Sequence, residues 1–320
     1  MEQLIVTTSP HIRSSKTTTK IMLDVIIALV PALIASVILF GFQALLVVMV
    51  SVTSCVVFEY FSRRIMKRGR TLTDLSAVVT GILLAFNLPV TLPLWMVVIG
   101  AFVAIVIAKQ LFGGLGQNLV NPAILGRIVL LVSFPAQMTT WAAPFYYQSA
   151  GTDVVTTATP LADITGITSS PTLMDMFLGV RGGCLGETCT LALLLGGIYL
   201  MIRRVISPVI PVTYIGVVYL FTAALGVNPN YQVMAGGLIL GAFFMATDYT
   251  TSPATGWGKF IFAIGCGVIT VVIRVFGSYP EGVSFAILLM NILVPWIDKI
   301  TQTKPFGKVK KPRNAAAAKK

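Results

Sequence analysis

The sequence predicts an all-α, polytopic membrane protein, and three observations lead to this prediction. Only 11% of its 320 residues are charged and its mean hydropathy is +0.89, whereas about 25% of residues are charged in an ordinary soluble domain. Several apolar runs approach the ~20 residues that cross a bilayer as a helix. Most of the charges fall at the edges of these runs. A soluble globular protein and a disordered chain are both excluded, because too little polar surface exists to face water.

The apolar runs predict about ten transmembrane helices, several of them short or interrupted by Gly and Pro. The expected spans are residues 21–40, 43–62, 75–88, 93–109, 119–134, 187–202, 207–225, 231–247, 257–276 and 281–298. The first twenty residues are polar and the first apolar run is long enough to remain as a helix, so we expect no cleavable signal peptide.

The basic residues predict the orientation of these spans. If the chain crosses the membrane ten times, 20 of the 23 Lys and Arg residues fall on one side. Because loops rich in Lys and Arg lie on the cytoplasmic side, both termini are expected in the cytoplasm of a cell-membrane protein. Residues 135–171 contain no Lys or Arg and are expected on the outer face, with Trp141 and Tyr146 at the headgroup level. Because the net charge of +12 is concentrated at membrane edges, no nucleic-acid partner is expected.

Two parts of the chain share a pattern. Gly81-Ile-Leu-Leu-Ala-Phe is similar to Gly237-Leu-Ile-Leu-Gly-Ala-Phe, and Ala123-Ile-Leu is similar to Ala286-Ile-Leu. Because the two copies begin on opposite sides of the membrane, we expect a five-plus-five inverted repeat with broken helices. Chance matching of hydropathy is the alternative.

This pattern divides the chain into five parts. They are a cytoplasmic segment (1–20), a first membrane repeat (21–134), an extracytoplasmic loop with a re-entrant segment (135–186), a second membrane repeat (187–298) and a basic cytoplasmic tail (299–320). The tail is expected to bind anionic lipid.

A Thr-dense segment lies in the long outer loop. Its sequence, Asp153-Val-Val-Thr156-Thr157-Ala158-Thr159, fits a solvated loop on composition alone. It also resembles the acceptor motif for covalent flavin attachment, Asp-x-x-Ser/Thr-Gly-Ala-Ser/Thr. In that motif the last hydroxyl is esterified to the phosphate of FMN. The match makes Thr159 the acceptor and Asp153 the acidic residue of the motif, while Thr157 stands where the motif has Gly.

Three further segments resemble the same family in order along the chain. They are Lys109 to Ala123, Gly182 to Thr188 and Phe244 to Pro253. The family is that of the membrane-embedded D subunit of the Rnf complex, together with the B subunit of the sodium-pumping NADH:quinone reductase. The compact length is more similar to the Rnf member.

The resemblance implies a function and partners. The chain would be an electron-carrying subunit of an ion-motive ferredoxin:NAD⁺ oxidoreductase, with FMN covalently bound to Thr159 and a second, non-covalent flavin, riboflavin. Other Rnf subunits, especially a second FMN-bearing subunit and the membrane iron–sulfur subunits, would surround it. The resemblance also implies a fold similar to that of urea transporters. A channel or secondary transporter without a redox role therefore remains the alternative, as does a structural scaffold.

Two candidate binding groups lie at helix starts. The glycine-rich stretch that ends at Asn118 follows no strand, so a nucleotide-binding loop is excluded. Asn118 and Asn121 are expected to line a helix break, unless the glycines serve tight packing alone. Arg181 and Glu187 flank the start of the span at 187–202 and predict either a phosphate seat or a mutual ion pair.

Ionisable residues inside the membrane require an explanation, because burying a charge in lipid is costly. Asp24 is expected to pair with Lys20, and Glu59 with Arg63. Asp248 lies beside several Ser and Thr hydroxyls that predict a site for a cation or for a flavin ribityl chain. A reduced, more negative flavin would favour such a cation, which would couple electron flow to Na⁺ or H⁺ transport.

Overall fold

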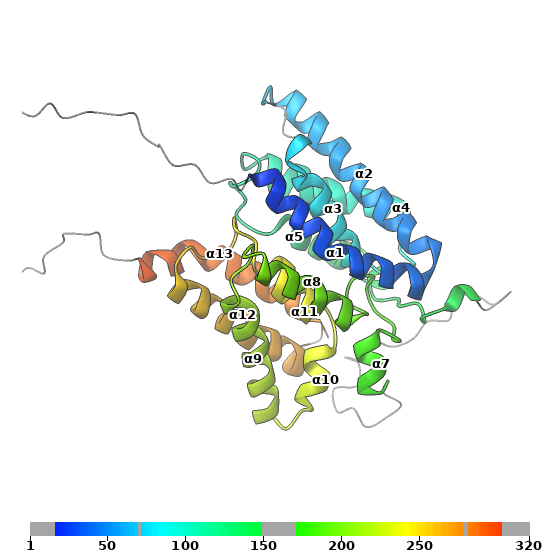
Figure 1. The fold of residues 1–320 in the computed structure, drawn as a ribbon. Coiled ribbons are helices and arrows are strands. Elements are labelled where there is room, and N and C mark those ends of the chain that lie inside the picture. The colour runs from blue at the N-terminus through cyan, green and yellow to red at the C-terminus, as the bar shows by residue number, and fades with distance from the viewer. Residues whose placement is uncertain (1–16, 70–71, 149–170, 278–280, 303–320) are drawn as a thin grey trace, which may run out of the picture.

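A computed structural model describes residues 17–69, 72–148, 171–277 and 281–302. The elements, in order, are α1 (Thr18–Phe40), α2 (Phe42–Ile65), η1 (Leu72–Asp74), α3 (Ser76–Phe86), α4 (Leu94–Phe102), η2 (Val103–Gln110), α5 (Pro122–Ser133), α6 (Pro135–Met138), η3 (Tyr146–Gln148), α7 (Leu173–Leu178), α8 (Thr190–Ile202), α9 (Val209–Ala224), α10 (Pro229–Met234), α11 (Leu238–Leu240), η5 (Gly241–Met245), α12 (Gly256–Phe276) and α13 (Val283–Thr301). The prediction of an all-helical protein is confirmed for these residues (Figure 1).

Four of these helices, α1, α2, α12 and α13, are long and apolar enough to cross a membrane. Five shorter apolar helices accompany them, among them α4 with its continuation η2. The protein is therefore a multi-pass membrane protein, while the number of ten spans stays a prediction.

The span expected at 231–247 is wrong as a single helix. α10 ends at Met234, and α11 begins at Leu238. Between them Gly236 has a φ of 63°, a left-handed conformation that a side chain disfavours. Similarly, α5 begins at Pro122, three residues after the expected start, because the Asn121 side chain accepts from the Ala123 and Ile124 amides and caps the helix.

Within the described part of the chain, two helices contain π-helical turns, which are wider than α-helical turns. α4 continues as the π-helix η2, and α11 continues as the π-helix η5. Such turns are rare in proteins overall, but those that occur are often found at functional sites. Both of these lie beside the polar cavity described below.

Glycines allow the closest contacts between helices. A Cβ on Gly196 of α8 would lie 2.1 Å from the Ala28 carbonyl oxygen of α1, and a Cβ on Gly81 of α3 would lie 2.7 Å from Val52 Cα of α2. In lipid the hydrophobic effect does not drive helices together. Van der Waals packing between backbones that approach closely contributes to helix association instead. Large apolar side chains instead cover the outer faces of α1 and α2.

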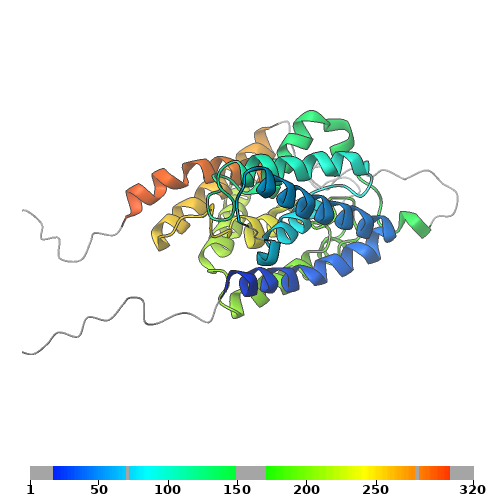
Figure 2. The same ribbon diagram turned by 90° about the horizontal axis from the view of Figure 1, so that it is seen from above.

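The starts of α1 and α12 and the ends of α2, α8 and α13 lie at one end of the molecule, which we call the basic end. Figure 2 shows the start of α1 and the end of α13 on the same side. Arg203, directly after α8, lies 3.4 Å from the Asp24 carboxylate of α1. Thr255, before α12, shares a 2.6 Å hydrogen bond with Thr301. The other ends of α8, α12 and α13 therefore lie at the opposite end.

Candidate functional site

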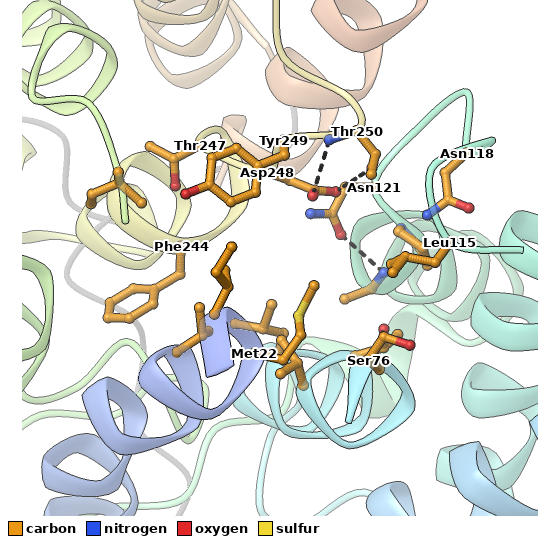
Figure 3. Close-up of a pocket in the computed structure, with 18 of the residues that line it drawn as sticks. Met22, Ser76, Leu115, Asn118, Asn121, Phe244, Thr247, Asp248, Tyr249 and Thr250 are labelled. Carbon is orange, nitrogen blue, oxygen red and sulfur yellow. Dashed lines mark hydrogen bonds between the residues drawn. The ribbon is translucent and has the colours of Figure 1, made fainter. Parts of the chain in front are cut away.

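Two buried polar regions lie towards opposite ends of the bundle. The first is a cavity of about 90 Å³ that we call the Asp248 cavity (Figure 3). Its polar lining comes from both halves of the chain, namely from Ser76, Thr80, Lys109, Asn118, Asn121, Thr247, Asp248, Tyr249 and Thr250. The structure thus brings together Asn118 and Asp248, which lie 130 positions apart in the sequence and were predicted separately.

The Asp248 carboxylate is held by the hydroxyls that follow it. It accepts hydrogen bonds from Thr250 Oγ1 at 3.0 Å, from the Thr250 amide at 3.3 Å and from Thr251 Oγ1 at 3.4 Å. Asn121 lies on the facing segment, and its side-chain amide donates to the Met245 carbonyl at 3.3 Å. Two helix breaks therefore meet at the cavity, one at Asn121, which caps α5, and one at Asp248, which follows η5.

A buried lysine forms another wall of this cavity. Lys109 is 1% exposed, and its Nζ donates to Glu59 at 2.8 Å and to Ser76 Oγ at 2.7 Å. Arg63 lies 3.8 Å from the same carboxylate, as predicted. Ser76 Oγ in turn donates to Asp74 at 2.6 Å. With Lys109 paired, the carboxylate, hydroxyl and amide oxygens near Asp248 suit a small hard cation.

The second region, the arginine cluster, contains Arg127, Arg181, Arg274, Cys184, Glu187 and Glu281. It gathers the three basic residues that lie outside the basic edges counted above. Arg127 of α5 donates to Asn87 Oδ1 at 2.8 Å, to Ser284 Oγ at 3.1 Å, to Cys184 Sγ at 3.6 Å and to the Glu281 carboxylate. Glu281 and Ser284 lie at the start of α13, which places the cluster away from the basic end.

Arg274 closes the cluster from α12. Its guanidinium donates to the carbonyls of Gln232 at 2.6 Å, Ala235 at 3.0 Å and Glu281 at 3.2 Å. The bonds to Gln232 and Ala235 satisfy carbonyls that the break between α10 and α11 leaves without helical partners. Arg274 thus stabilises the break.

Arg181 and Glu187 do meet, but not as an ion pair. Arg181 Nη2 donates to the main-chain carbonyl of Glu187 at 2.6 Å. Arg181 Nε and Nη1 and Glu187 Oε2 are buried without a hydrogen-bond partner. The alternative of a carboxylate–guanidinium pair is therefore wrong in this structure, and unsatisfied donors remain for a ligand.

Unpartnered polar atoms are concentrated around the arginine cluster. Among the described residues, eleven buried side-chain atoms lack a partner, and seven belong to the cluster or to residues next to it, on Arg127, Arg181, Glu187, Thr188, Tyr231 and Gln232. Leaving such groups unsatisfied costs about 1–3 kcal/mol each. The cluster also has one more arginine than carboxylates. It therefore suits a polar ligand that carries or gains negative charge.

A metal ion suits the cluster less well. One ligand atom each from Cys184, Glu187 and Glu281 lies within 4.8 Å of the others. However, Arg127 donates to both Cys184 and Glu281. A guanidinium thus already supplies the positive charge that a metal ion would bring.

The residues predicted in the outer loop, Thr159, Asp153 and Thr156, lie outside the described residues. Directly after that gap, Thr172 and Asp175 form a capping box that starts α7. Asn87 and Glu281 were not predicted as site residues, although Arg127 inside an apolar span indicated that a carboxylate had to lie nearby.

Comparisons with known proteins agree with this architecture. The chain is 48% identical over 98% of its length to the D subunit of the Na(+)-translocating ferredoxin:NAD(+) oxidoreductase complex of Acetobacterium woodii, covering 98% of that protein. It is 46% identical over 94% of its length to the D subunit of the proton-translocating ferredoxin:NAD(+) oxidoreductase complex of Clostridium ljungdahlii, covering 96%. It is 40% identical to the D subunit of the ion-translocating oxidoreductase complex of Stutzerimonas stutzeri, with 94% and 95% coverage. The model of the NQR2, RnfD, RnfE family matches residues 5–307, and the chain belongs to that family.

Proposed function

We propose that the chain is the membrane-embedded, electron-transferring D subunit of an ion-motive ferredoxin:NAD⁺ oxidoreductase, the Rnf complex, with FMN bound to Thr159 by a phosphoester. Family membership and the names of the relatives support the assignment to this complex. The observation that carries the flavin assignment is the arginine cluster, because seven of the eleven buried side-chain atoms without a partner among the described residues lie in it or next to it, together with an excess of positive charge.

Polar groups in the cluster and next to it match the polar edge of an isoalloxazine ring. That edge has one N–H donor with one carbonyl acceptor on each side. Arg181 offers two unpartnered N–H groups and Gln232 offers its side-chain amide, while Glu187 Oε2 offers an acceptor. A flavin supplies one- and two-electron transfer when it is bound. Arg127 and Arg181 would hold negative charge at that edge, and the apolar surroundings would exclude water. Alternatively, Arg181 would hold the phosphate, as its position before α8 suggests.

Thr159 is connected to this cluster by a short stretch of chain. Only twelve residues separate Thr159 from Thr172, which caps α7. α7 packs on α8 and α10, the helices beside the cluster. An extended segment of this length reaches roughly 40 Å. A flavin attached at Thr159 would therefore reach Arg181 and Glu187.

The Asp248 cavity is our proposed cation site. Asp248, Asn118 and the hydroxyl of Thr247 would hold Na⁺, or Asp248 alone would hold a proton. A hydrated cation fits a space of about 90 Å³. The same lining would accept riboflavin only if the side chains moved.

Packing between the halves supports the inverted repeat and a fold similar to that of urea transporters. α1 packs against α8, and α5 packs against α13. In a five-plus-five repeat these are the first and fifth helices of each half, so each packs on its own counterpart. The flavin loop would then lie on the extracytoplasmic side and both termini in the cytoplasm. The second FMN-bearing subunit and the membrane iron–sulfur subunits would be its neighbours.

Fluorescence tests the covalent flavin. The full-length chain is produced in a host that has the flavin transferase, denatured, separated by electrophoresis and viewed under ultraviolet light. We expect a fluorescent band that Thr159→Val abolishes and that Thr165→Val, in the same loop, retains. Peptide mass spectrometry should find the FMN mass on the peptide that contains Thr159.

Two results would contradict the proposal. A dark wild-type band would favour the channel or secondary transporter. Full electron transfer by an assembled complex that carries Thr159→Val would favour the structural scaffold.

A further inference from the structure

A second pocket lies at the basic end, between the start of α1 and the end of α8. Its volume is about 260 Å³, and its walls include Lys20, Asp24, Arg203, Arg204 and Tyr249. Three cationic side chains thus face one carboxylate, which leaves a formal charge of +2. A pocket with this balance favours an anion.

Contacts between the helices hold the walls of this pocket in place. Asp24 accepts a hydrogen bond from the Tyr199 hydroxyl at 3.0 Å, and it lies 3.4 Å from Arg203. The Tyr249 hydroxyl donates to the Val205 carbonyl. Asp24 therefore fixes Arg203 against α1, while Tyr249 fixes the turn that carries Arg204.

Arg204 occupies a position where glycine is usual. Its φ is 55°. The Arg204 amide donates to the Met201 carbonyl at 3.0 Å, and the Val205 amide donates to the Leu200 carbonyl at 2.9 Å. This is a Schellman motif, in which the left-handed residue is normally Gly because side chains disfavour that conformation. Arginine here adds charge to the pocket at the cost of backbone strain.

The surroundings of the pocket are those of a membrane edge. Leu23 of α1 and Ile202 of α8 are exposed by 47% and 74%. The cations directly above these apolar faces therefore lie at the boundary between headgroups and acyl chains. A basic pocket between helices at this level suits the phosphate of an anionic lipid.

We propose that this pocket binds the phosphodiester headgroup of an anionic phospholipid, with the acyl chains lying over Leu23 and Ile202. Arg203 and Arg204 would donate to the phosphate oxygens, because guanidinium groups match phosphate geometry. The lipid would connect α1 to α8, which form one of the contacts between the two halves of the chain.

Native mass spectrometry of the full-length chain in maltoside micelles tests this site. Phosphatidylglycerol is titrated into wild type, Arg204→Gly and Lys67→Gly, and the lipid-bound fraction is measured. Lys67 is a matched control, because it is also a basic residue with a positive φ, 54°, after a helix at the basic end, but it lies outside the pocket. We expect about fivefold weaker binding for Arg204→Gly, which corresponds to ~1 kcal/mol per cation, and no change for Lys67→Gly.

The fold is expected to survive both substitutions, since glycine relieves the left-handed conformation, and equal or higher Tm values would show this. Phosphatidylcholine should bind weakly, and equimolar inorganic phosphate should not displace phosphatidylglycerol. Equal binding of lipid by all three proteins would overturn the proposal. So would equal losses in both variants, or displacement by free phosphate, which would identify a site for the small anion instead.

Discussion

The Asp248 cavity and the arginine cluster differ in how far their polar groups are satisfied. Lys109 and Asp248 find partners within the chain, on Glu59, Ser76 and the two threonines. Around Arg181 and Glu187, donors and acceptors remain without partners. In the lining of the cavity, Asn118 Oδ1 is the one buried side-chain atom of the described residues that lacks a partner. A single free acceptor suits a small cation, whereas the several free donors and acceptors of the cluster suit a larger polar ligand. The difference supports a transient cation in the cavity and a permanent flavin in the cluster.

The largest expected effect is on the arginine cluster. Arg127→Met leaves the Glu281 carboxylate beside Cys184 without its guanidinium, and breaking a buried pair costs about 3–5 kcal/mol. Unfolding in detergent should show a large fall in Tm. The double variant Arg127→Met with Glu281→Gln should recover much of the loss. If the double variant is no more stable than the single one, the pair does not hold the cluster together.

A smaller loss is expected at the cavity. Lys109→Met removes the nearest cation from Glu59, but Arg63 remains 3.8 Å away. We expect about 2 kcal/mol, below the range for a fully uncompensated pair. The same unfolding experiment measures it, with Lys259→Met, which lies outside this pair, as the control. A loss as large as that of Arg127→Met would mean that the two regions do not differ in the way we infer.

Asp248→Asn should change ion binding more than stability. The amide keeps a side-chain oxygen near Thr250 but removes the negative charge, so a tenfold loss of affinity, about 1.4 kcal/mol, is expected for Na⁺. Thermal shifts recorded against NaCl, with choline chloride at equal ionic strength, report this change. Flavin fluorescence should stay unchanged. An unaltered Na⁺ dependence would remove the cavity from the ion path.

The smallest effect on stability is expected from Gly183→Ala. Its Cβ would lie 2.8 Å from Glu187 Oε1, the far end of a side chain that can move. The Tm should change little, whereas the visible absorption and reduction potential of bound flavin should shift because the carboxylate moves. Gly256→Ala, which has no atom within 4 Å of its Cβ, is the matched control. Identical flavin spectra in both variants would argue against Glu187 as a flavin neighbour.

Much of the architecture could be predicted from the sequence, because hydropathy and charge act locally. Such patterns predict the membrane edges near Arg63 and Arg203, and they predict that several spans are interrupted. The break at Gly236 could not be located, because the carbonyls it exposes are satisfied by Arg274, 38 positions later in the sequence. Asn118 and Asp248 could each be chosen as candidates, but their shared cavity depends on packing between the halves. Likewise, nothing local connects Glu281 to Arg127.

The π-helical turns of η2 and η5 have a consequence for how this chain can change. Each wide turn corresponds to one residue inserted into a regular helix. Deleting a single residue between Val103 and Ala108 would therefore restore a regular α-helical turn, and Lys109 would keep its direction towards Glu59. The same deletion in an α-helix without such a turn, such as α12, would rotate every later side chain by about 100° around the helix axis. The two wide turns thus make these segments more tolerant of a change in length than the regular helices of the bundle.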